Sequence, residues 1–98
     1  MGPLRIEWDA AKAAANLRAH SIGFEEAETV LGDENGLLLT DPAHSAAEDR
    51  FILLGLSASL RVLVVVHCYR ADDTVIRIIS ARKATRSERA QYVERWRP

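Results

Sequence analysis

The chain has 98 residues, of which 48% are hydrophobic and 28% are charged, and its formal net charge is −1 at pH 7. Such a chain builds a single core, which leaves no room for a second domain, and its composition is that of a folded protein rather than a disordered one. Because no apolar run approaches the roughly 20 residues of a membrane-spanning helix and MGPLRIEW lacks the apolar core of a secretion signal, we expect a cytoplasmic protein with no membrane partner.

The N-terminal third is predicted to be a short strand followed by two helices. Alternating residues in LRIEW, at 4–8, indicate the strand, and Asp9 can cap an alanine-rich helix over residues 10–20. The predicted apolar stripe of this helix is Ala10, Ala13, Ala14 and Leu17, whereas Lys12 and Asn16 share another face. Gly23 can cap a second helix over 24–31, with Phe24, Ala27, Val30 and Leu31 buried.

From residue 37 onward the sequence becomes strand-like. The predicted strands are LLLT at 37–40, RFILLGL at 50–56, LRVLVVVHCY at 60–69 and TVIRIIS at 74–80, with the loop DPAHSAAED at 41–49. Three or four of them are expected to pair antiparallel. LVVVHC, at 63–68, is apolar on both faces and is therefore predicted to be the central strand.

A capping box predicts the last helix. The side chains of Thr85 and Glu88 can satisfy reciprocal backbone donors at its start. The helix is predicted to run to about residue 95, with Tyr92, Val93 and Trp96 as its anchors.

Charge is segregated along the chain. Residues 1–60 hold four basic and ten acidic side chains, giving −6, whereas residues 61–98 hold nine basic and four acidic ones, giving +5. This asymmetry favours a nucleic acid or an acidic protein as the ligand.

Metal and disulfide chemistry are not indicated. The single cysteine, Cys68, lies in an apolar run and is expected to be buried and inert. His20, His44 and His67 lie more than twenty residues apart, without the close pairing of zinc signatures, so we expect no metal and no cofactor.

The turn RADDT, at 70–74, decides whether two reactive side chains meet. A three-residue loop would place His67 opposite Arg77, with Tyr69 beside them and Arg82 near the strand end. A two-residue loop would instead set His67 against Ile78 and separate the pair. Both registers stay open at this point.

Histidine and arginine side by side could cleave RNA. Attack by the 2′-hydroxyl of the RNA needs a base, cations for the charge on phosphorus and an acid for the leaving 5′-oxygen, and it requires no metal. Histidine can be base or acid at neutral pH, and arginine binds phosphate through two N–H groups. The alternatives are a core histidine at His67, a carboxylate partner for Arg77, and a solvated helix face made of Lys83, Arg86 and Arg89.

Several segments together resemble the BrnT toxins of bacterial type II toxin–antitoxin pairs. They are EWDAAKAAANLRAHSIGFEEAETVL, DPAHSAAEDRFILLGLS, LVVVHCYR and IRIISARKATRSERAQY, and they extend from about residue 6 to residue 92. The resemblance implies an α+β, RelE-like single domain over residues 1–98, with an antiparallel sheet of about four strands, two N-terminal helices and one C-terminal helix. Residues 1–3 are expected to be a cloning remnant.

The resemblance also implies a function. The protein would be a ribonuclease that arrests translation and forms a hetero-oligomer with a BrnA-type antitoxin, which alone would contact operator DNA. The family pattern points to Trp8, Lys12, His20, Arg77, Ser80, Arg82 and Glu88, whereas His67 falls where the family varies.

The turn between the helices departs from the family. The usual His-Gly-x-Ser-Phe reads His20-Ser21-Ile22-Gly23-Phe24 here, so glycine and serine have exchanged places. Ser21 would stand where glycine favours the left-handed conformation, at a cost of roughly 1 kcal/mol, and Gly23 where serine is the better cap, at a few tenths.

The prediction from sequence is thus a metal-independent endoribonuclease toxin. The predicted catalytic residues are Arg77, Arg82, Lys12 and His67, and the predicted substrate-binding residues are Trp8, Lys83, Arg86 and Arg89. The alternative is a non-catalytic module that binds an acidic or disordered protein through the same basic face. A plain RNA-binding domain ranks last, because only 6% of residues are aromatic.

Overall fold

A computed structural model describes residues 4–40 and 50–95 of the chain. The predicted loop at 41–49, with His44, and the predicted anchor Trp96 lie outside the described residues, as do residues 1–3. The elements in chain order are β1 (Arg5–Glu7), α1 (Ala10–His20), α2 (Phe24–Val30), β2 (Leu37–Thr40), β3 (Phe51–Leu56), β4 (Val62–Arg70), β5 (Val75–Lys83) and α3 (Arg86–Glu94).

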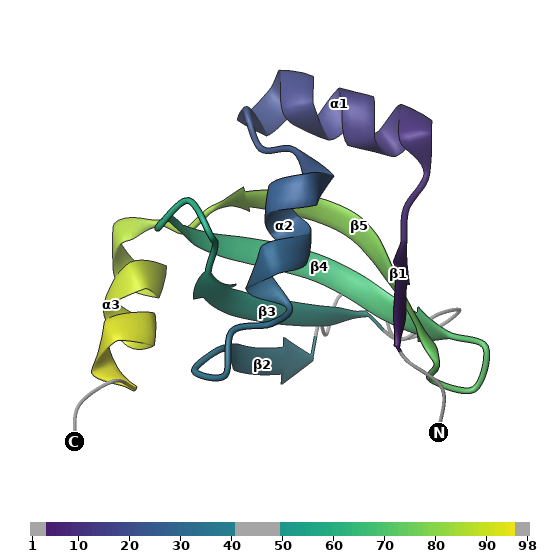
Figure 1. Ribbon diagram of the computed structural model, residues 1–98. Helices are drawn as coiled ribbons and strands as arrows, with labels where there is room; N and C mark the ends of the chain where they lie inside the picture. The colour runs from purple at the N-terminus through teal and green to yellow at the C-terminus, as the bar shows by residue number, and fades with distance from the viewer. Residues whose placement is uncertain (1–3, 41–49, 96–98) are drawn as a thin grey trace.

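The strands form one sheet in the order β1-β5-β4-β3-β2 (Figure 1). The four strands from β2 to β5 are antiparallel, and β4 is central as predicted. The expected α+β fold with two N-terminal helices and one C-terminal helix is confirmed, but the expected RelE-like sheet of about four antiparallel strands is not fully matched, because β1 joins as a fifth strand and pairs parallel with β5. The local alternation of LRIEW predicts a strand, but its partner lies about seventy residues further along the chain and leaves no local signal.

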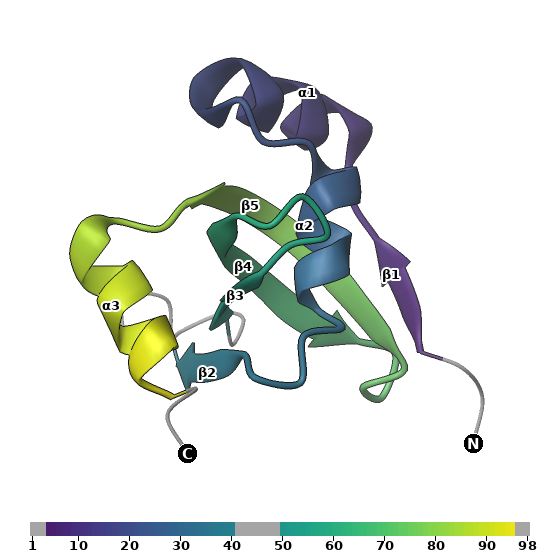
Figure 2. The same ribbon diagram turned by 60° about the vertical axis from the view of Figure 1, so that its left-hand side comes forward.

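Helices lie on both faces of the sheet. α1 and α2 pack on one face, where Phe24, Ala27 and Val30 meet Leu63 and Val65 of β4. α3 packs on the other, where Tyr92 meets Leu54 of β3 and Val64 of β4. Since α3 is short and lies at one end of the sheet (Figure 2), no helix among residues 4–40 and 50–95 covers the rest of the second face. We call this second face the α3 face.

The buried face of α1 is centred on a polar residue. The predicted apolar stripe was wrong, because Leu17 is 54% exposed whereas Asn16 is buried. β1 pairs with β5 only as far as Arg77. Further along the same edge of β5, the side-chain amide of Asn16 forms hydrogen bonds with the backbone of Ala81. Asn16 Nδ2 donates to Ala81 O (2.9 Å) and to Ile22 O (2.9 Å), and Oδ1 accepts from Ala81 N (3.0 Å). The amide therefore acts as a strand would, joining α1 to the sheet edge.

A carboxylate joins α3 to the rest of the fold. Asp33, after α2, accepts hydrogen bonds from the backbone N–H of Leu56 (2.8 Å) and from the Tyr92 hydroxyl (2.5 Å). Tyr92 is buried as predicted, but Val93 is 53% exposed, so its predicted role as an anchor was wrong. No helix within the described part of the chain is long and apolar enough to cross a membrane.

Candidate active site

The β4–β5 turn selects the register that separates histidine from arginine. Asp72 and Asp73 both have positive φ values, 56° and 66°, and Thr74 N donates to Ala71 O at 3.1 Å, as in a tight two-residue hairpin. His67 consequently pairs with Ile78, and Arg77 pairs with Cys68. The predicted alternative with His67 opposite Arg77 was wrong, and because neighbouring residues of a strand point to opposite faces, these two side chains do not meet.

His67 lies in the core. It is 1% exposed and contacts the rings of Phe51 and Tyr69, at centroid distances of 6.2 and 5.7 Å. By strand alternation it points to the face covered by α1 and α2, together with Leu63 and Val65. Burial lowers its pKa, so the ring is neutral at pH 7. RNA has no access to this histidine in the folded protein.

Arg77 lies on the α3 face, paired with a carboxylate. The parallel register sets Glu7 of β1 beside it, and Arg77 Nη1 donates to Glu7 Oε2 at 2.6 Å. The hydrogen bond that Arg77 donates to Glu7 raises the pKa of Arg77, so the guanidinium stays charged. Both side chains are partly exposed, which leaves the pair within reach of a ligand.

Arg82 is joined to the first turn of α3. Its Nη1 and Nη2 donate to the two carboxylate oxygens of Glu88, at 2.8 and 2.9 Å. Glu88 also completes the predicted capping box, since its Oε1 accepts from Thr85 N (2.8 Å) while Thr85 Oγ1 accepts from Glu88 N (3.1 Å). These bonds, first of all that from Arg82, lower the pKa of Glu88 to about 2. One carboxylate thus fixes both the guanidinium and the helix.

A β-bulge places the two arginines on the same face. Regular alternation would send Arg77 and Arg82 to opposite faces, because an odd number of positions separates them. The register shifts between Val66 and His67 of β4, and Ile79 is the extra residue of β5. Arg82 pairs with Val64 as Arg77 pairs with Cys68, so both arginines point to the α3 face, as does Ser80 opposite Val66.

The spacing of the arginines defines what they can bind. Their partners Val64 and Cys68 lie four residues apart on β4, which separates the backbones of the two arginines by about 13 Å. The two guanidinium groups are therefore suited to different phosphates of one RNA strand rather than to a single phosphate.

The N-terminal family positions do not form a cluster. Trp8 is partly buried and packs edge-on against Phe24, at 5.9 Å between ring centroids, so it belongs to the core rather than to an open stacking surface. Lys12 and His20 are exposed at the two ends of α1, about 12 Å apart along the helix. Lys12 stands one turn before Asn16, on the helix that follows the edge of β5.

The three remaining cations divide between two sides of the molecule. Lys83 pairs with Leu63 and so points toward the layer of α1 and α2, whereas Arg86 and Arg89 are exposed on α3.

Sequence reasoning missed the roles of Asn16, Glu7 and the bulge at Ile79. A lone asparagine in an alanine-rich helix was the one signal for any of them.

Within residues 4–40 and 50–95, no group of three histidine, cysteine, aspartate or glutamate side chains could hold a metal ion. The α3 face instead brings together Arg77 and Arg82, their carboxylate partners Glu7 and Glu88, and the hydroxyl of Ser80. Such a set can bind an anionic backbone and accept a proton, which is the chemistry that RNA cleavage without a metal requires.

Comparison with known proteins identifies the family. The model of the family described as "Ribonuclease toxin, BrnT, of type II toxin-antitoxin system" matches residues 8–88. The chain belongs to the BrnT family. Its members are ribonuclease toxins of type II toxin–antitoxin systems, and the matched segment ends at Glu88, the partner of Arg82.

A solved BrnT structure supports the fold. The crystal structure of the Brucella abortus ribonuclease toxin BrnT superposes with a TM-score of 0.64 at 21% sequence identity, covering 85% of this chain and 99% of that chain. The TM-score shows that the two proteins share their overall fold despite the low sequence identity. No curated protein matches the chain.

Proposed function

We propose that this BrnT-family protein is a metal-independent endoribonuclease that cleaves RNA in the cytoplasm and thereby inhibits translation. A cognate BrnA-type antitoxin would neutralise it in a hetero-oligomer, and only the antitoxin would contact operator DNA. Family membership supports the class of activity. The observation that carries the choice of site is the bulge at Ile79, because it brings Arg77 and Arg82 to the α3 face.

In the proposed reaction, the two arginines bind different phosphates of one RNA strand, and Arg77, which stands beside Glu7, stabilises the charge that develops on the scissile phosphorus. Each guanidinium is held by a carboxylate, which limits the side-chain freedom lost when RNA binds. Both side chains remain partly exposed, so N–H groups not used by Glu7 or Glu88 can reach a phosphate. Lys12 is exposed on α1, which packs on the other face of the sheet, and it is not assigned to this site.

The proton of the 2′-hydroxyl needs an acceptor on this face. Glu88 is poorly suited, because two guanidinium N–H groups and a backbone N–H occupy its oxygens and lower its pKa to about 2. His67 is excluded from the proposed site because it is buried on the other face. We assign the role to the partly exposed carboxylate of Glu7, which stands beside Arg77. The 2′-oxygen then bonds to phosphorus while the 5′-oxygen leaves and takes a proton from water.

A non-catalytic module is the second candidate. The observation that favours it is that both arginines already have carboxylate partners, which compete with phosphate for the same N–H groups. Such a protein would bind an acidic or disordered partner and leave RNA intact. Purified protein that fails to cleave RNA but binds its partner would support this alternative.

Expression of single variants in cells tests the proposal. Arg77→Ala and Arg82→Ala should each relieve growth arrest and restore incorporation of labelled amino acids. Arg18→Ala, an exposed arginine on α1, is the matched control and should remain toxic. Circular dichroism of each purified variant must show the native fold. Full toxicity of a folded variant lacking both Arg77 and Arg82 would refute the assignment of the site.

A further inference from the structure

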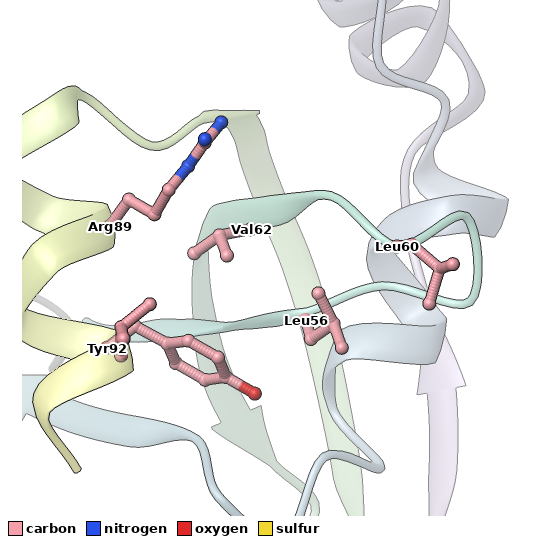
Figure 3. Close-up of a pocket in the computed structure, with 6 residues that line it drawn as sticks. Leu56, Leu60, Val62, Arg89 and Tyr92 are labelled. Carbon is pink, nitrogen blue, oxygen red and sulfur yellow. The ribbon is translucent and has the colours of Figure 1, made fainter. Parts of the chain in front are cut away.

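An apolar groove lies between α3 and the turn that joins β3 to β4 (Figure 3). We call it the α3 groove and define it by its lining residues Leu56, Leu60, Val62, Arg89, Tyr92 and Val93. Five of these six are apolar or aromatic, and the single charged side chain is Arg89. Figure 3 shows the side chains of Tyr92 and Arg89 extending from α3 and that of Leu60 at the tip of the β3–β4 turn.

Leu60 combines two features that oppose stability. Its side chain is 80% exposed, and its backbone has a φ of 63°, in the left-handed region that favours glycine or asparagine. Across the groove, Val93 is 53% exposed. Neither the exposure of this side chain nor a leucine at a positive φ stabilises the isolated fold. Together they indicate that the side chain of Leu60 serves to contact a partner.

The charge around the groove indicates the chemistry of its occupant. Arg86 and Arg89 are exposed on the same helix, and within the described residues neither guanidinium has a carboxylate partner. An amphipathic segment with acidic side chains would complement such a rim, with apolar side chains on Leu60 and Val93. RNA is the weaker fit, because a nucleic-acid backbone gains little from five apolar lining residues.

The groove adjoins the proposed active site. Val62 lies two residues from Val64, the β4 partner of Arg82, and Tyr92 lies one helical turn after Glu88 on the same face of α3. An occupant of the groove would therefore lie against the Arg82–Glu88 pair. The α3 side of the groove, with Arg89, Tyr92 and Val93, lies beyond the segment that matches the family model. A surface at this place is suited to recognition of one cognate partner.

We infer that the α3 groove binds an amphipathic, acidic segment of the cognate antitoxin, and that this segment covers Arg82. The inference rests on the proposed function, because it requires that the protein has an antitoxin. It goes beyond that function by assigning the contact surface and the chemistry of the segment that occupies it.

The test measures antitoxin affinity by calorimetry together with RNA cleavage. Val93→Asp should weaken binding of the purified antitoxin by about tenfold or more, with cleavage unchanged. Leu17→Asp is the matched control, because Leu17 is equally exposed but lies on α1, and it should bind normally. Leu60→Gly should raise the midpoint of thermal unfolding yet weaken binding, an opposition that a purely structural role for Leu60 would not produce.

Methyl NMR of the wild-type chain identifies the occupant. Antitoxin should shift the methyl signals of Leu60 and Val93, the exposed residues of the groove, whereas an RNA oligonucleotide should leave these two in place. Unchanged affinity in both variants, shifts caused by RNA, or shifts that depend on protein concentration alone would each overturn the inference. Failure of the proposed function is distinguishable, since a wild-type chain that binds antitoxin but cleaves no RNA would leave the groove assignment standing.

Discussion

Replacing Asn16 by alanine should destabilise the protein more than an alanine at any other position of α1. The substitution removes three hydrogen bonds from a buried amide and leaves Ala81 N, Ala81 O and Ile22 O without their partner. At about 1 kcal/mol for each bond, less about 0.5 kcal/mol for the better helix propensity of alanine, the loss is about 2–3 kcal/mol. For a domain of this size that corresponds to a fall of roughly 10–20 °C in the unfolding midpoint.

Urea denaturation followed by circular dichroism measures this loss, with Arg18→Ala as the control on the exposed side of the same helix. The control should change the free energy of unfolding by less than about 0.5 kcal/mol. A loss below about 1 kcal/mol in Asn16→Ala would refute the view that this amide substitutes for a missing strand at the edge of β5. Asn16→Asp should be at least as damaging, because a carboxylate oxygen would then face two carbonyl oxygens.

Three further changes test the turn, the capping network and the packing under β3. Ser21→Gly should stabilise the fold by about 1 kcal/mol in urea denaturation, because Ser21 has a φ of 58° at the C-cap of α1; a destabilised variant would contradict this reading. The pKa of Glu88 is lowered to about 2 from an ordinary value of about 4.5, so its contribution to stability is present above about pH 4.5 and is lost as the pH falls toward 2. Stability measured from pH 6 to pH 2 should fall less steeply in Glu88→Gln, and parallel curves would exclude this role. Gly55→Ala should cost about 1–3 kcal/mol, because the added Cβ would lie 2.9 Å from Cγ1 of Val30, and a neutral result in thermal unfolding would show that the contact relaxes freely.

Local signals predicted the elements well. Asp9 caps α1, Gly23 precedes α2, and Thr85 with Glu88 forms the capping box of α3. Each of these depends on residues within four positions of one another, and so the sequence displays them directly. The central place of β4 was also predictable, since a strand that is apolar on both faces has to be covered on both.

The wrong predictions for α1, α3 and β1 concern contacts between residues that are distant in sequence. Asn16 is buried because it binds Ala81, 65 residues away, and no periodicity in α1 reveals that partner. Val93 is exposed because α3 reaches only one end of the sheet, which the pattern of its own residues does not show. The parallel pairing of β1 likewise depends on an edge that exists only once the sheet has formed.

The candidate site was predicted in part. Arg77 and Arg82 were selected from their unusual place in an apolar strand, but the bulge that brings them to one face has no signal in VIRIISARK. Glu7, the partner of Arg77, comes from β1 and could not be assigned without the parallel register. His67 was selected for its chemistry, and its burial was the alternative that the structure favours.

The most direct test of the account is cleavage of a short labelled RNA by purified protein in the presence of a chelator, under single-turnover conditions. We expect cleavage that leaves 2′,3′-cyclic phosphate ends, and no cleavage when a 2′-deoxy nucleotide replaces the one at the scissile position. Arg77→Ala combined with Arg82→Ala should slow the reaction by about a hundredfold or more, while Arg18→Ala should cleave normally. Undiminished cleavage by the folded double variant would contradict the central claim that the α3 face is the active site.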